Sequence, residues 1–108
     1  MSTTLARIQD LIAQRQYFIT RHALEEAEDD AISLANLLAA MPQAVIVEDY
    51  AEATRGPSVL CRLEVKQNEF IHAVWGIANA EPNTTGLVTT YRPDPKLWSS
   101  DFLKRRAK

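Results

Sequence analysis

The spacing of apolar residues changes at Pro42, and this change constrains the fold more than any other feature. Upstream, apolar residues recur every three or four positions, beginning with Leu5, Ile8 and Leu11. That spacing is typical of a helix with one buried face. Downstream, apolar and polar residues alternate, as they do in a strand with one face on the core. The sequence therefore predicts an α+β fold in which helices precede strands.

Three helices are expected in the first part of the chain. The first covers residues 4–16, the second covers residues 21–30, and the third begins after Ser33. Thr20 and Ser33 are the expected N-caps, because short hydroxyl side chains accept hydrogen bonds from the free N–H groups of a first helical turn. Residues 17–19 are too few for a helix and predict an extended connector.

The second helix is expected to be amphipathic, with Leu24 and Ala27 pointing inward. Its remaining positions are rich in acids, namely Glu25, Glu26, Glu28, Asp29 and Asp30. We interpret these carboxylates as a solvated acidic face.

Four strands are expected after the helices, over residues 44–50, 59–66, 70–78 and 86–91. The connections between them are short, which favours an antiparallel meander with the helices packed on one face. Residues 96–108 are expected to form a short C-terminal helix or tail held by apolar side chains.

The composition indicates one globular domain over residues 1–108, with 46% hydrophobic and 24% charged side chains. No apolar run approaches the roughly 20 residues of a membrane-spanning helix, and no secretory signal is readable at the N-terminus. The single cysteine, Cys61, excludes an internal disulfide and is expected to be a buried, unreactive thiol in a reducing compartment. We therefore expect a cytoplasmic protein without membrane contact.

Charge is distributed unevenly along the chain. The formal net charge is −2, which argues against a general nucleic-acid binder. Residues 1–54 carry three basic and nine acidic side chains, whereas residues 55–108 carry nine basic and five acidic ones. An acidic half followed by a basic half permits a positive patch on a mildly acidic protein.

No motif with a recognised catalytic spacing is present. The sequence lacks paired Cys/His zinc ligands, a phosphate-binding glycine loop and a Gly-x-Ser-x-Gly elbow. The residues left as candidates for chemistry are polar side chains on a predicted helix start, a loop and two strands: Arg21, His22, Arg55, His72, Thr89, Thr90, Tyr91 and Arg92.

The two histidines each allow two interpretations. His22 lies in the first turn of a predicted helix, where the helix dipole disfavours its charged form and nearby acids favour it. It is either a proton-transfer group or a histidine packed under the helix start. His72 lies in mid-strand among apolar residues and is either catalytic or a hydrogen-bonded core residue. Glu26 lies four residues after His22, but two histidines without further ligands do not predict a metal site.

Arg55 and Tyr91 have similar alternatives. Arg55 precedes Gly56-Pro57 in a predicted loop, where it can bind a phosphate or carboxylate with two N–H groups or remain solvated. Tyr91 is either a supporting catalytic group or a half-buried aromatic with a solvated hydroxyl.

Several segments together resemble the DUF4258 domain family. They are Ile19-Thr20-Arg21-His22-Ala23-Leu24-Glu25 with Ile32-Ser33, Val47-Glu48-Asp49-Tyr50, Arg55-Gly56-Pro57-Ser58, Ile71-His72-Ala73-Val74, and Thr89-Thr90-Tyr91-Arg92-Pro93-Asp94-Pro95 with Trp98. They occur in the family's order and cover residues 17 to 98. The chain departs from the family pattern at Glu26 and Ala27, where an arginine and a methionine are usual, and at Ala31, where a glycine is usual.

The resemblance implies a fold similar to that of the RelE-like and barnase-like ribonucleases. Members of that wider group cleave RNA without a metal, and several are bacterial toxins. The resemblance thus suggests RNA as a substrate and an antitoxin as a protein partner, with no cofactor.

Two functional hypotheses follow. In the first, the domain is a metal-independent endoribonuclease in which His22 and His72 are the acid/base pair, Arg55 binds phosphate and Tyr91 supports catalysis. Arg21, Thr90 and Arg92 would then contact the substrate. In the second, the same scaffold is a non-catalytic module that binds a protein or acidic partner through its basic second half, with His22 and Arg55 in structural roles. The acidic helix, the glutamate at position 26 and the net charge of −2 favour this hypothesis.

Overall fold

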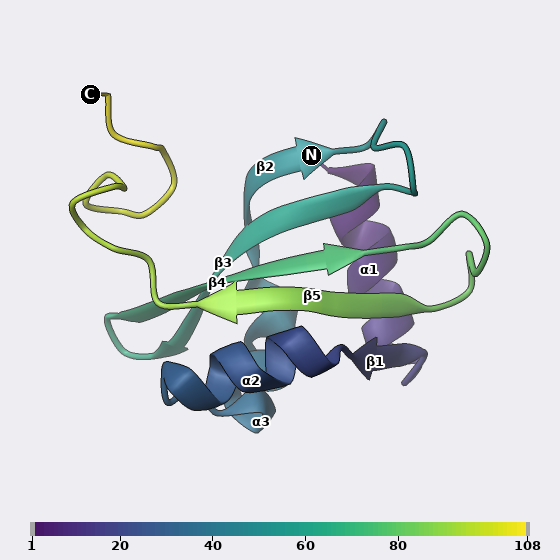
Figure 1. Ribbon diagram of the computed structural model, residues 1–108, viewed down its shortest axis with the longest axis horizontal. Helices are drawn as coiled ribbons and strands as arrows, with labels where there is room; N and C mark the ends of the chain where they lie inside the picture. Colours follow the sequence, from purple (N-terminus) through teal and green to yellow (C-terminus); the bar gives the residue numbers. More distant parts are fainter. Residues whose placement is uncertain (1, 108) are drawn as a thin grey trace.

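The computed structural model describes residues 2–107, which form a five-stranded sheet with helices packed on one face (Figure 1). The strand order is β1-β5-β4-β3-β2, with β1 parallel to β5 and all other neighbours antiparallel. The elements are α1 (Thr3–Ala13), β1 (Tyr17–Ile19), α2 (Arg21–Asp29), α3 (Leu34–Ala40), a 3₁₀ turn (Met41–Gln43), β2 (Val45–Tyr50), β3 (Ser58–Lys66), β4 (Glu69–Gly76) and β5 (Thr85–Tyr91). The α+β class is confirmed.

The helix starts follow the predicted capping. The Thr20 hydroxyl accepts a hydrogen bond from the Ala23 N–H at 3.1 Å, and the Ser33 hydroxyl accepts one from Asn36 at 3.1 Å. Ser2 caps α1 in the same way. These bonds satisfy N–H groups that have no partner within the helix.

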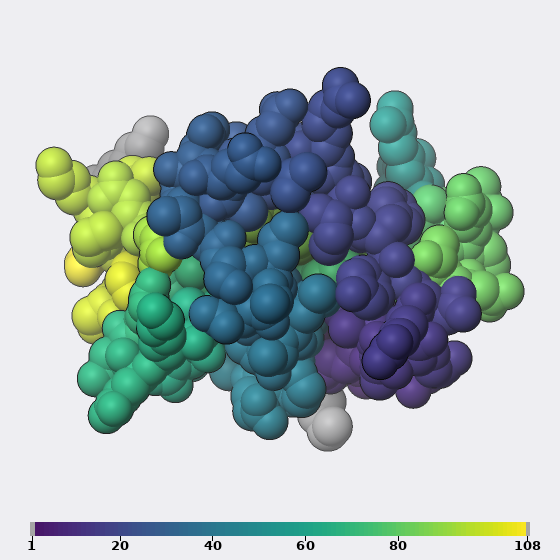
Figure 2. All heavy atoms as spheres, turned by 90° about the horizontal axis from the view of Figure 1, so that it is seen from below, coloured from purple at the N-terminus to yellow at the C-terminus, as the bar shows by residue number. Residues whose placement is uncertain are grey.

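The helices cover one face of the sheet and form the core with it. Figure 2, which looks onto that side, shows residues of α2 and α3 spread over the centre of the molecule. The inward side chains of β3 and β4 are fully buried, among them Cys61 and Trp75. From α2, Ala23 and Ala27 join this core, at 0% and 2% exposure. The expectation that Leu24 points inward is wrong, because this side chain lies on the flank of α2 and is 44% exposed.

The predicted four-stranded antiparallel meander is corrected to a five-stranded mixed sheet. The expected connector at residues 17–19 is the edge strand β1, and its middle residue Phe18 pairs with Gly86. The Thr85 N–H donates to the Gln16 carbonyl at 3.1 Å and the Thr20 N–H donates to the Leu87 carbonyl at 3.2 Å, extending this pairing at both ends. These three residues form a strand because they pair with the free edge of β5. Three residues are too few for a strand pattern to be recognised in the sequence.

The segment after β5 was expected to be a short helix or a tail. It is a tail, because residues 92–107 contain no helix. Asp94 organises its first turn, since its carboxylate accepts from the Lys96 N–H at 2.8 Å. A single bridge joins Trp98 to Arg105. Trp98 is buried at 4% exposure, whereas Leu97 is 63% exposed and does not hold the tail in place. Figure 1 shows this segment leaving the end of β5 and running away from α2.

Two further features bear on the expectations above. None of the helices within residues 2–107 is both long and apolar enough to span a membrane. Cys61 is fully buried, and burial raises the pKa of its thiol to about 12.

Candidate functional site

The face of the sheet that points away from the helices carries the main polar cluster. Side chains alternate along β4, so His72 lies on the opposite face from the buried Ile71 and Ala73. His72 pairs across the sheet with Tyr91 on one side and with Arg62 on the other. The structure therefore brings two of the expected catalytic residues, His72 and Tyr91, into direct contact.

The hydrogen bonds of His72 define its protonation pattern. Its Nε2 lies 2.8 Å from the Phe102 carbonyl oxygen, which can only accept, so Nε2 carries a hydrogen. In the neutral ring, Nδ1 is then an acceptor for the Tyr91 hydroxyl at 3.2 Å. The Trp98 ring stands edge-on against the imidazole, with centroids 4.5 Å apart. The tail thus covers His72 completely and leaves Tyr91 as the half-buried end of the pair.

Burial dominates the titration of both rings. Desolvation lowers the pKa of His72, although the Phe102 carbonyl and the charge of Glu48 oppose this effect. Desolvation also raises the pKa of Tyr91. At neutral pH the pair is therefore a neutral imidazole accepting from a protonated phenol, and both shifts keep the proton on Tyr91.

A carboxylate and an arginine lie at the rim of the same cluster. Glu48 on β2 accepts two hydrogen bonds from Arg105 of the tail, at 2.8 and 3.1 Å, and a third from the Tyr50 hydroxyl. The bond from Arg105 is the main reason that the pKa of Glu48 is lowered. Arg105 also lies 4.7 Å over the Trp98 ring, and its side chain remains 65% exposed. This pair is reachable from solvent, unlike His72.

Arg62 extends the cluster along β3. One terminal nitrogen donates to the Asp101 carbonyl at 2.8 Å, and the guanidinium carbon lies 4.7 Å over the Phe70 ring. Its Nε is buried without a hydrogen-bond partner in the part of the chain that the structure describes. Arg62 therefore adds a positive charge beneath this face, although its unpartnered Nε is closed to solvent.

His22 lies elsewhere. It belongs to the first turn of α2, on the helix-covered side, and its side chain is 64% exposed. Its nearest acidic group is Glu26, with Nε2 and Oε1 3.9 Å apart. His22 and His72 therefore belong to opposite sides of the sheet and do not form a pair.

Arg55 lies at the other end of the open face from His72. It occupies the loop between β2 and β3, next to the strand ends where Ser58 pairs with Gly76. Gly76 lies four positions after His72 on β4, which corresponds to roughly 13 Å along the strand. Arg55 thus shares the face of His72 without contacting it.

The three residues expected to bind substrate differ in their surroundings. Arg21 is exposed at the start of α2. Thr90 is fully buried and donates to the His72 carbonyl at 2.8 Å, which is a structural bond. Arg92 donates to the Asp30 and Ala31 carbonyls at 2.8 and 3.0 Å. Arg92 also pairs with a β4 carboxylate and so joins the end of α2 to the sheet.

Sequence reasoning missed four members of the cluster, namely Glu48, Tyr50, Arg62 and Arg105. Arg62 alternates with buried residues on a predicted strand, which was a usable signal for its face. Glu48 and Tyr50 lie on an edge strand that has no buried residue, so their signal was weaker. Arg105 carried no such signal, because only the folded tail brings it to Glu48.

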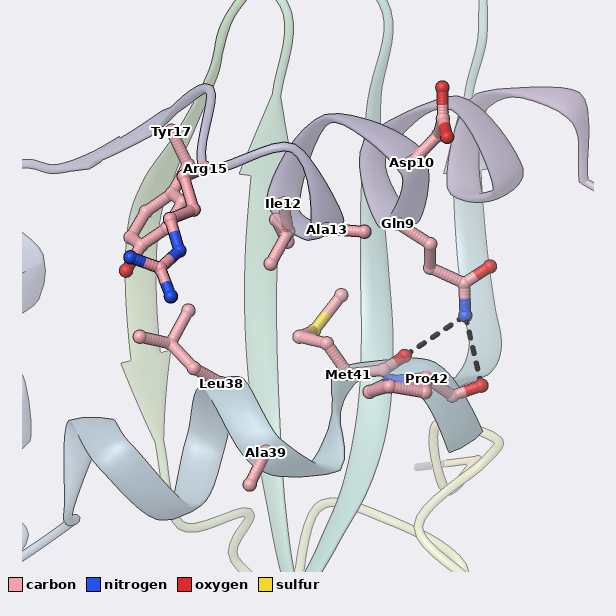
Figure 3. Close-up of a pocket in the computed structure, with 10 residues that line it drawn as sticks. All are labelled: Gln9, Asp10, Ile12, Ala13, Arg15, Tyr17, Leu38, Ala39, Met41 and Pro42. Carbon is pink, nitrogen blue, oxygen red and sulfur yellow. Dashed lines mark hydrogen bonds between the residues drawn. The ribbon is translucent and has the colours of Figure 1, made fainter.

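A groove of about 680 Å³ lies on the helical side, between α1 and α3 (Figure 3). Its walls are mostly apolar, and Gln9 spans it by donating to the Met41 carbonyl at 2.9 Å. It contains none of the expected site residues. Within residues 2–107, no three His, Cys, Asp or Glu side chains gather into a potential metal site.

Comparison with known proteins identifies the family. Neither a curated protein nor a solved structure matches the chain. The model of a family described as a domain of unknown function (DUF4258) matches residues 19–92. This match begins in β1 and ends directly after β5, so it includes His22, Arg55, His72 and Tyr91. Because it covers more than half of the sequence, the chain belongs to the DUF4258 family.

Proposed function

We propose that this domain cleaves RNA without a metal, using the open face of the sheet as its active surface. The observation that carries the proposal is the gathering of Glu48, Arg62, Tyr91 and Arg105 around the buried His72. A proton acceptor, a proton donor and two arginines are the groups that phosphodiester transesterification requires.

The proton-transfer roles follow from the hydrogen bonds. Glu48 accepts the proton of the ribose 2′-hydroxyl as its oxygen attacks phosphorus. The bond from phosphorus to the 5′-oxygen breaks, and Tyr91 donates its proton to that leaving oxygen. His72 Nδ1 accepts the Tyr91 hydroxyl in the free protein and so fixes the position of the phenol oxygen, which makes His72 a positioning residue. The hydroxyl turns from Nδ1 toward the leaving oxygen before it donates its proton. The products are a 2′,3′-cyclic phosphate and a free 5′-hydroxyl.

The arginines supply charge stabilisation. The exposed guanidinium of Arg105 can bind phosphate oxygens directly, whereas Arg62, whose Nε is buried, contributes its positive charge at longer range. Arg105 is held by Glu48 in the free protein. A phosphate that takes over Arg105 releases Glu48 to act as the base, so substrate binding itself prepares the site.

This assignment differs from the one that sequence suggested. It keeps His72 and Tyr91, replaces His22 by Glu48 as the second proton-transfer group, and assigns phosphate binding at the reacting centre to Arg105, with Arg62 adding charge at longer range. Likeness to RelE-like and barnase-like ribonucleases, an antitoxin partner and a cytoplasmic location remain parts of the proposal that rest on the family resemblance alone.

The direct test is cleavage of a short single-stranded RNA in the presence of EDTA, with a DNA of the same sequence as a control that lacks the 2′-hydroxyl. We expect Tyr91→Phe and Arg105→Gln to lower kcat by about 10²- to 10⁴-fold. The matched controls are Tyr17→Phe and Arg15→Gln, on the helical side, which should retain activity.

Two outcomes would contradict this assignment. Equal cleavage by wild type, Tyr91→Phe and Arg105→Gln would show that the cluster is not the active site. Loss of cleavage in a folded His22→Ala variant would return that histidine to a catalytic role.

A second candidate function has its own observation. Leu24 is 44% exposed on α2 and is flanked by the acids Glu25 and Glu28, an apolar spot in an acidic surface. Such a surface suits a basic amphipathic segment of a protein partner. If the domain is a binding module, Leu24→Asp should abolish partner capture while RNA is left intact by the wild type.

A further inference from the structure

A hollow of about 300 Å³ opens on the same sheet face, at the end of β4 that lies away from His72. Its lining comes from β1, β5, β4 and the loop before β3, and the residues that matter here are Phe18, Arg55, Gly76 and Gly86. Its exposed lining is almost entirely apolar apart from the arginine. The volume lies at the lower end of the range of small-molecule sites.

The floor of the hollow is bare backbone. Gly76 of β4 pairs directly with Gly86 of β5, so two neighbouring positions on this face carry no side chain. The Phe18 ring lies against Gly86, where an added Cβ would come within 2.5 Å of it. The ring is nevertheless 50% exposed, because its other side faces outward. An exposed aromatic ring fixed beside a flat floor is a stacking platform.

Arg55 brings a positive charge to the edge of this platform. Asn79, three residues after the end of β4, holds the backbone of this loop with two hydrogen bonds. Its backbone N–H donates to the Arg55 carbonyl at 3.0 Å, and its side-chain amide donates to the Thr54 carbonyl at 3.0 Å. The Arg55 guanidinium makes no hydrogen bond or ion pair within residues 2–107. The backbone thus holds Arg55 in the lining of the hollow that also contains Phe18.

We propose that this hollow is a base-binding subsite for single-stranded RNA, in which Phe18 stacks on one base and Arg55 binds the adjoining phosphate. For its substrate class the proposal rests on the proposed ribonuclease function. Because Gly76 of the hollow and His72 lie on one face, about 13 Å apart along β4, one RNA strand can contact both regions. Asp49 and Glu52 line a neighbouring hollow, where their negative charges would repel a phosphate. We therefore expect the phosphate on the Arg55 side.

The test uses adenosine 5′-monophosphate as the probe, followed by chemical shifts of backbone amides at millimolar concentrations. We expect shifts at Gly86 and Arg55, and binding about 5- to 100-fold weaker in Phe18→Leu, the cost of losing one stacked base. Val45→Ala, which removes another exposed apolar side chain from an edge strand, should bind like the wild type. Binding of ribose 5-phosphate, which lacks the base, should be weakened by Arg55→Gln and left unchanged by Phe18→Leu.

The result that overturns the subsite is an absence of shifts at Gly86 and Arg55, or equal affinity of Phe18→Leu and wild type for adenosine 5′-monophosphate. Failure of the ribonuclease function looks different. In that case no RNA is cleaved, yet the nucleotide still binds at Phe18 and the subsite stands. If RNA is cleaved with the same KM by Phe18→Leu and wild type, the subsite falls while the ribonuclease function stands.

Discussion

Acid should loosen the docking of the tail on the sheet through His72. Its Nε2 donates to the Phe102 carbonyl and its ring lies against Trp98. Burial is the largest cause of its lowered pKa, and the charges of Arg105 and Arg62 act in the same direction. Glu48 and the Phe102 carbonyl oppose the shift without cancelling it.

The sign of the effect follows from proton linkage. Because the pKa of His72 is lower in the folded protein than its usual 6.5, the unfolded chain binds the proton more readily. The contribution of neutral His72 to stability is therefore complete above pH 6.5 and is lost as the pH falls from 6.5 toward the folded-state pKa. One proton limits the slope to about 1.4 kcal/mol per pH unit. The lowered pKa of Glu48 acts in a separate window, below its usual 4.5.

The assay compares urea unfolding of wild type and His72→Gln at several pH values between 7.5 and 5.0. We expect the free energy of unfolding of the wild type to fall by up to about 1.4 kcal/mol per pH unit below 6.5, and that of His72→Gln to change much less. His22→Gln is the matched control and should keep the wild-type pH dependence. Parallel curves for wild type and His72→Gln across this window would refute the reasoning.

Three further predictions concern stability. Ala31 has a φ of 53°, so Ala31→Gly should raise the free energy of unfolding by about 0.5–1 kcal/mol in urea titrations, and a loss would contradict the left-handed strain. Trp98→Ala should lower the free energy of unfolding by about 3–5 kcal/mol if the tail unfolds with the rest of the domain. Rapid protease cleavage after residue 92, with little loss of global stability, would instead show that the tail detaches on its own. Thr20→Ala removes an N-cap and a 2.8 Å hydrogen bond to the Leu87 carbonyl, so thermal unfolding should show a loss of stability of about 1–2 kcal/mol. Thr3→Ala, at the start of α1, is the control and should change the stability little.

Much of the fold could be predicted because its cues are local. Capping hydroxyls and apolar spacing gave the starts of α2 and α3, and alternation gave the faces of β3 and β4. Leu24 shows the limit of this reasoning, because helical spacing alone cannot tell which flank of a short helix turns toward the sheet. Tyr17–Ile19 shows another limit, since a three-residue strand exists only through a partner almost 70 residues later.

The site was less predictable because its members meet through the tail. His72 and Tyr91 lie on neighbouring strands, so their contact follows from strand register once the order of the strands is known. Arg105 reaches Glu48 across 57 positions of sequence, by a path of turns that has no periodicity. Residues that irregular segments bring to such a site are therefore the hardest to predict from sequence patterns.

The placement of the two charged surfaces also bears on the choice between the candidate functions. Arg62, Arg105 and Arg55 lie on or beside the open sheet face, whereas Glu25 and Glu28 lie on α2 across the sheet. The arginines share the open side with Glu48, and Asp49 and Glu52 line a hollow there, whereas acids surround Glu26 on α2. The family's usual arginine, replaced here by Glu26, would lie on α2 and away from His72. Under the proposed ribonuclease function, that replacement leaves the proposed catalytic residues unchanged, so it weighs less against RNA cleavage than the sequence alone suggests.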